Sequence, residues 1–146
     1  MKPLCCLLLS VMLLFVPNVY GAEAGIVVIV HPDNPVNSLS RNQVIDIFMG
    51  RFTCFPNGSI ALPIDQAPDC QTRNDYYRLL VGKSVSQVNA YWARLLFTGR
   101  ATPPRPLDSA VKVLEAVSNN RDAIAYINEQ DSTASVKIVY RLEEAP

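Results

Sequence analysis

The sequence lacks an excess of charge of either sign, since 13 lysines and arginines balance 13 aspartates and glutamates in 146 residues. Nucleic-acid-binding proteins usually carry a basic excess, so no nucleic-acid partner is expected. His31 is the only histidine and no CxxC pair occurs, so no metal site is expected either. With 49% hydrophobic and only 18% charged residues, the chain is too apolar to be disordered, and its length suits one domain.

The signatures of catalysis are also missing. No serine lies in a GxSxG elbow, and a serine–histidine–aspartate triad would depend on His31. The sequence contains neither a P-loop nor a GxGxxG motif, and its acidic residues are scattered rather than paired. We therefore expect a protein that is not an enzyme and that needs no cofactor.

The N-terminus predicts a secretory signal peptide over residues 1–24. Lys2 is followed by an almost unbroken apolar run over residues 4–16, and then by small residues. Cleavage is expected after Gly21 or after Ala24. The run is shorter than the roughly 20 apolar residues that span a membrane, so an uncleaved anchor is the less favoured alternative. We expect an exported domain over residues 25–146, with no membrane span after cleavage.

Removal of the signal peptide would leave Cys54 and Cys70 as the only cysteines. In an oxidising compartment two such thiols are expected to form a structural disulfide. A metal or redox pair is the weaker alternative, because it would normally use closer spacing or additional histidines.

The remaining pattern predicts one α/β domain with a mixed, mostly parallel sheet flanked by helices. The β-branched run over 25–30 is typical of a strand buried on both faces. Capping boxes at Ser40–Gln43 and Ser84–Gln87 predict that helices begin directly after each serine. Further helices are expected to begin at Thr72 or Asn74 and after an N-cap at Asp108 or Ser109. The other strands are expected at 60–64, 123–127 and 136–140, and proline-rich 101–107 is expected to be a non-helical connection.

The candidate site is Gln71, Thr72, Arg73 and Asn74, where a strand is expected to lead into a helix. Backbone N–H groups at a helix N-terminus suit an oxyanion, to which a hydroxyl and a guanidinium could add donors. The alternative is structural: Thr72 or Asn74 caps the helix, and Arg73 is solvated or pairs with Asp69.

Several segments resemble the phosphate-binding proteins of ABC transporters, and in particular their short, single-lobe exported members. The resemblance follows the order of the family along most of residues 25–146. The segments that carry it are VNSLS (36–40), IDIFMGR (45–51), ALPID (61–65), YWARLLFTGR (91–100), Pro103-Pro104 and AIAYI (123–127).

The resemblance implies a single lobe of a type 2 periplasmic-binding-protein fold and a periplasmic location. Phosphate or another small oxyanion would be the ligand. Complete members close two lobes on the ligand, so a single lobe would need a protein partner or a homodimer to complete the cleft. The helix start departs from the family's Gly-Ser-Gly-Thr pattern, because residues 71–73 read Gln-Thr-Arg, and only Thr72 matches its hydroxyl donor. Two hypotheses follow: an oxyanion-binding module, or an accessory protein that keeps the lobe and has lost anion binding.

Overall fold

The computed structural model describes residues 25–143, so the predicted signal peptide lies outside the described residues. No helix in this part of the chain is long and apolar enough to cross a membrane. The strands are β1 (Ile26–Val30), β2 (Leu62–Gln66), β3 (Arg105–Leu107), β4 (Ala123–Asn128) and β5 (Lys137–Leu142). The helices are α1 (Arg41–Phe48), α2 (Gln71–Val81), α3 (Val85–Phe97), α4 (Ala110–Ser118) and a 3-10 turn at Glu129–Asp131.

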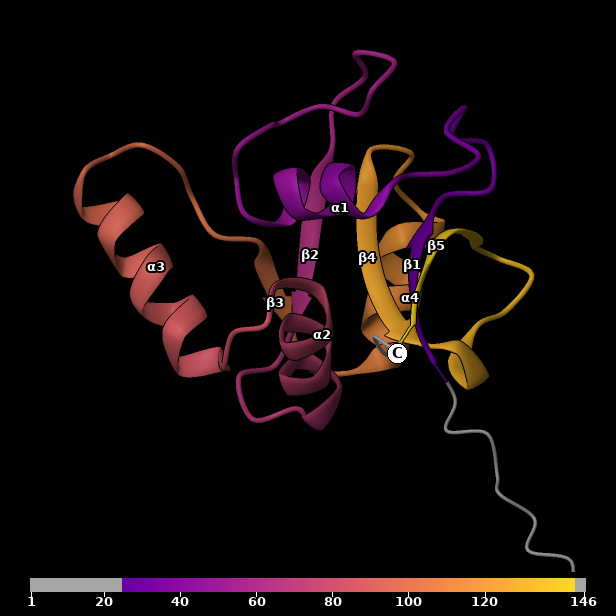
Figure 1. Cartoon of the computed structure of the whole chain (residues 1–146). Coiled ribbons are helices and arrows are strands. Elements are labelled where there is room, and N and C mark those ends of the chain that lie inside the picture. Colours follow the sequence, from indigo (N-terminus) through magenta and orange to yellow (C-terminus); the bar gives the residue numbers. More distant parts are fainter. Residues whose placement is uncertain (1–24, 144–146) are drawn as a thin grey trace, which may run out of the picture.

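The strands form one mixed sheet in the order β3-β2-β4-β1-β5 (Figure 1). β2 pairs in parallel with β3 and β4, whereas β1 pairs antiparallel with β4 and β5. The predicted mixed α/β architecture is therefore confirmed. The expectation of a mostly parallel sheet is wrong, because two of the four strand pairings are antiparallel.

β1 is buried on both faces, as its β-branched sequence predicts. Val28 and Val30 belong to the core that also contains residues of α1, α2 and α3. Val27 and Ile29 face the other way and pack in a second core with α4. The alternation of side chains along one strand thus divides the domain into a three-helix side and a one-helix side.

The helix starts agree closely with the sequence. Ser40 and Ser84 both form complete capping boxes, and the Ser109 side chain caps α4. The strands agree less well. β2 begins two residues later than expected and ends with Asp65 and Gln66, which are buried. β3 forms within the proline-rich connection, where Pro106 is tolerated because β3 is an edge strand that pairs only with β2.

The predicted disulfide is wrong, because Cys54 and Cys70 are both free thiols. Cys54 forms an isolated bridge with Ile60, just before β2 begins, whereas Cys70 follows the opposite end of that strand. A five-residue strand is roughly 16 Å long, whereas the Cα atoms of a disulfide must lie within about 7 Å. The Cys70 thiol instead donates to Gln66 Oε1 at 3.1 Å.

We predict that Gly50→Ala lowers the free energy of unfolding by about 2 kcal/mol or more. Gly50 has φ +71°, and a Cβ there would lie 2.6 Å from Cη2 of Trp92. Gly99→Ala is the matched control, because Gly99 has φ +68° and open space around its Cα. Urea unfolding would measure both variants. Equal losses would contradict the role of the Trp92 contact, since backbone strain is common to both.

Candidate functional site

The candidate site lies where β2 and β4 end and α2 begins. β2 and β4 are parallel neighbours, so their carboxyl ends meet at one edge of the sheet, where ligands of α/β proteins commonly bind. α2 begins at Gln71, directly after its N-cap Cys70, and no side chain caps it. Neither Thr72 nor Asn74 is therefore the cap that the structural alternative required.

The first amides of α2 remain available. The amides of Arg73 and Asn74 donate to the carbonyl of Cys70 at 3.1 and 3.3 Å. Those of Gln71 and Thr72 have no acceptor among residues 25–143. Two N–H groups at the positive end of the helix dipole are thus free to bind an acceptor.

Thr72 is the predicted site residue that is held in place by a neighbouring strand. Its Oγ1 accepts a hydrogen bond from Nδ2 of Asn128, the last residue of β4, at 3.1 Å. The Thr72 hydroxyl can then donate its own hydrogen to a ligand. Gln71 and Asn74 are exposed, and the Gln71 side chain donates to Asp75 within α2.

Arg73, in contrast, points into the protein. Its side chain is buried, and Nε donates to Oδ2 of Asp65 at 3.1 Å while Nη2 donates to Oδ1 of Asn89 at 3.1 Å. The partner of Arg73 is thus Asp65 in β2, and not Asp69 or solvent. Since a buried carboxylate compensates the charge of Arg73, this residue adds no net charge at the start of α2.

The Asp65 carboxylate receives four hydrogen bonds. Oδ2 accepts from Arg73 and from the hydroxyl of Tyr77, and Oδ1 accepts from the Gln66 amide and the Tyr126 hydroxyl. Saturation by donors on both oxygens is the environment that stabilises an ionised carboxylate in a protein interior. Asp65 thereby joins β2, α2 and β4 directly beneath the candidate site.

Aromatic rings enclose this carboxylate. Tyr76 stacks on Tyr126 with ring centroids 3.6 Å apart, and Phe48 and Tyr77 pack edge-on against them. Burial, and then the charge of Asp65, raises the pKa of Tyr126 and of Tyr77 well above the usual value. The pKa of Tyr76 is raised by burial and then by Tyr77. All three tyrosines therefore stay protonated, as the donation of Tyr77 and Tyr126 to the Asp65 carboxylate requires.

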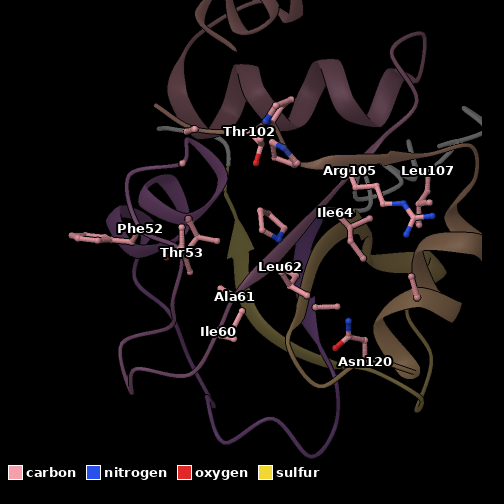
Figure 2. Close-up of a pocket in the computed structure, with 18 of the residues that line it drawn as sticks. Phe52, Thr53, Ile60, Ala61, Leu62, Ile64, Thr102, Arg105, Leu107 and Asn120 are labelled. Carbon is pink, nitrogen blue, oxygen red and sulfur yellow. The ribbon is translucent and has the colours of Figure 1, made fainter. Parts of the chain in front are cut away.

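A pocket of about 930 Å³ opens on the side of the sheet where β3 is the edge strand (Figure 2). Leu62 and Ile64 of β2 and Arg105 and Leu107 of β3 line it, together with the loop that precedes β2. Several of the large apolar side chains nearby are exposed to solvent. They are Phe52 at 59%, Ile60 at 58% and Leu62 at 46% exposure.

The chain matches no protein-family model and no curated protein sequence. Solved structures are similar in fold, among them three whose alignments each cover 79% of this chain. An ABC-type phosphate transport receptor from Vibrio cholerae has a TM-score of 0.63 at 20% identity. A protein from Clostridium perfringens, described as a phosphate ABC transporter substrate-binding protein and solved with bound phosphate, has 0.63 at 22%. PstS from Borrelia burgdorferi has 0.58 at 13%.

The fold of the chain is similar to that of part of each of these proteins. It spans 45%, 44% and 46% of the three aligned chains, which is less than half of each. The predicted resemblance is therefore confirmed at the level of the fold, as an α/β unit of the periplasmic-binding-protein type.

Sequence reasoning missed the residues that organise the site from within. Asp65 and Gln66 lie beyond the strand expected at 60–64, and no sequence motif marks Asn89 or Asn128. The sequence does contain one signal that points to Asp65. This residue directly follows the apolar run that ends at Ile64, so it was expected to lie near the carboxyl end of a strand. The donors that converge on Asp65 come from three separate elements, which no local pattern reveals.

We predict opposite outcomes for two adjacent, fully buried hydroxyls. Tyr126→Phe removes a donor to Asp65 and should lower the free energy of unfolding by about 1.5–3 kcal/mol. The Tyr76 hydroxyl has no partner among residues 25–143, so Tyr76→Phe should leave stability unchanged or raise it. Because the two rings are stacked, each variant controls for the packing of the other. Equal losses in urea unfolding would contradict this assignment.

We also predict a loss of stability at alkaline pH. The pKa values of Tyr76, Tyr77 and Tyr126 are raised by folding, so unfolded tyrosines release protons above pH ~10 that the folded protein retains. The free energy of unfolding should then fall by up to about 4 kcal/mol per pH unit. Urea unfolding between pH 9 and 11 would measure the slope, and Tyr76→Phe should reduce it by removing one buried tyrosine. An unchanged slope in that variant would contradict the prediction.

Proposed function

We propose that this protein is an exported solute-binding module that holds phosphate or a similar small oxyanion at the start of α2. The observation that carries the proposal is the Thr72 hydroxyl, fixed by Asn128 beside the free amides of Gln71 and Thr72. These donors are arranged at the positive end of a helix, where anions bind favourably. The Clostridium perfringens protein of similar fold was solved with phosphate, which supports this class of ligand.

Export is proposed from the sequence of residues 1–24, with its cationic start and short apolar run. The periplasm is the proposed location, with the domain released after cleavage. The proposed role is binding rather than catalysis, in keeping with the transport receptors that share the fold.

The oxyanion site is expected to be weak in the isolated chain. Its donors are neutral, because Arg73 is paired with Asp65. The carboxylates of Asp69, which is exposed, and Asp75, which is half-buried, also lie nearby in sequence. A single lobe also leaves a bound ion open to water, which weakens every polar contact to it. We propose that tight capture requires a second surface, supplied by a homodimer or a partner protein.

The alternative function is an accessory protein that keeps the lobe and binds no anion. It is favoured by the exposed apolar residues Phe52, Ile60 and Leu62 near the large pocket and by Phe97, 95% exposed at the end of α3. We favour a second copy of this chain as the partner that covers these apolar residues, because the structures of similar fold are about twice as long. Dimerisation without phosphate affinity would support this alternative.

The test is a calorimetric titration of the protein with phosphate at low salt. We expect saturable binding that Thr72→Val weakens about tenfold or more, because the valine keeps the shape but loses the hydrogen bond to the anion. Thr102→Val is the matched control, since Thr102 is exposed in the α3–β3 connection and should bind phosphate like the wild type.

A flat titration up to millimolar phosphate would contradict the proposal for the isolated chain. Equal binding by the wild type and Thr72→Val would support phosphate as the ligand but exclude the start of α2 as its site. Arg73→Ala is not an informative variant, because it would leave Asp65 buried without its cation and so destabilise the fold.

A further inference from the structure

A second, smaller pocket lies between α3 and the β2–β3 end of the sheet. Its volume is about 270 Å³, just below the usual range for pockets that hold drug-sized ligands, so it suits only a small molecule. Trp92 and Leu96 of α3 form apolar walls, together with prolines from the β2–α2 loop and from the segment around β3. Asp65, Arg73 and Asn89 supply its polar lining.

Two buried donors on the residues lining this pocket have no partner. Nη1 of Arg73 makes no hydrogen bond to any of residues 25–143, although Nε and Nη2 are both bonded. The indole Nε1 of Trp92 is likewise buried and unbonded within that range. Arg73 and Trp92 are only 8% and 5% exposed. Buried donors are nearly always satisfied in proteins, so these two indicate a missing acceptor.

This pocket is separate from the oxyanion site. Thr72 bonds to Asn128 in β4, whereas the next residue, Arg73, bonds to Asn89 in α3. β4 and β3 flank β2 on opposite sides, and Pro106 of β3 lines the small pocket. Adjacent residues of one helix thus contact elements on opposite sides of β2.

The charges of the residues that line the small pocket indicate which class of ligand it can hold. Arg73 and Asp65 compensate one another, and none of the other residues between 25 and 143 that line the pocket is ionisable. An anion would bring an uncompensated charge close to the Asp65 carboxylate, at a high cost in an apolar environment. An uncharged acceptor satisfies the free donors without that cost.

We propose that the small pocket binds an uncharged carbonyl compound with a small apolar body. The carbonyl oxygen accepts from Arg73 Nη1, and from Trp92 Nε1 where the ligand reaches it. The apolar body packs against the prolines and Leu96. This inference does not depend on the proposed oxyanion function, because it uses different donors.

The test compares isobutyramide with isobutyrate, which have the same shape and differ in charge. Trp92 is the only tryptophan in the chain, so its indole N–H gives a unique signal in a ¹H–¹⁵N spectrum of the labelled protein. We expect isobutyramide to shift that signal saturably, and isobutyrate to bind at least about tenfold more weakly.

A matched pair of variants locates the binding. Ala93 lines the pocket and Ala90 does not, and both are exposed on α3. Ala93→Leu should obstruct the pocket and weaken isobutyramide at least about tenfold, whereas Ala90→Leu should bind as the wild type does. The absence of any isobutyramide shift, equal affinity for isobutyrate, or equal binding by the two variants would overturn the proposal.

Phosphate serves as a cross-check in the same spectrum. It should leave the Trp92 indole signal in place even where calorimetry detects phosphate binding. Movement of that signal by phosphate would place an anion in the small pocket and overturn the assignment to an uncharged ligand. The proposed oxyanion function is tested separately, by calorimetry with Thr72→Val. A failure of that proposal can therefore be told apart from a failure of the small-pocket proposal.

Discussion

The buried carboxylate of Asp65 is the group on which both proposed binding surfaces depend. It receives donors from its own strand, from α2 and from β4, and so fixes how these elements meet at one edge of the sheet. It also draws the Arg73 guanidinium inward. As a result, neighbouring residues of α2 serve different surfaces: Thr72 faces β4 and Arg73 faces α3. A single charge in the core therefore decides the polarity of both sites.

As a consequence, both proposed sites offer a ligand hydrogen-bond donors but no net charge. At the start of α2 the available donors are two backbone amides and one hydroxyl. In the small pocket they are the free nitrogens of a compensated guanidinium and an indole. Neutral donors discriminate by geometry and by the exclusion of water more than by long-range attraction. Affinity should therefore depend strongly on what covers each surface.

Much of the fold could be predicted from local sequence. The Ser40 and Ser84 capping boxes and the β-branched run of β1 are short-range signals, and the structure confirms all three. The helix that begins at Gln71 was expected from the sequence to within a few residues, but the direction of Arg73 depends on Asp65 and Asn89, which lie 8 and 16 residues away. The disulfide was predicted from composition and compartment alone, which say nothing about the strand that separates Cys54 from Cys70.

The position of β1 has a consequence for how the chain folds. The first strand of the described chain lies between β4 and β5, the last two in sequence, so Val27 pairs with both Ile127 and Arg141. Closing loops of this length is entropically costly and slow. A chain that emerges N-terminus first must therefore hold an apolar strand unpaired until its last segment arrives. This topology favours folding after the whole domain has emerged, and during that interval the Gly25–Val30 segment is the one that most needs protection from aggregation.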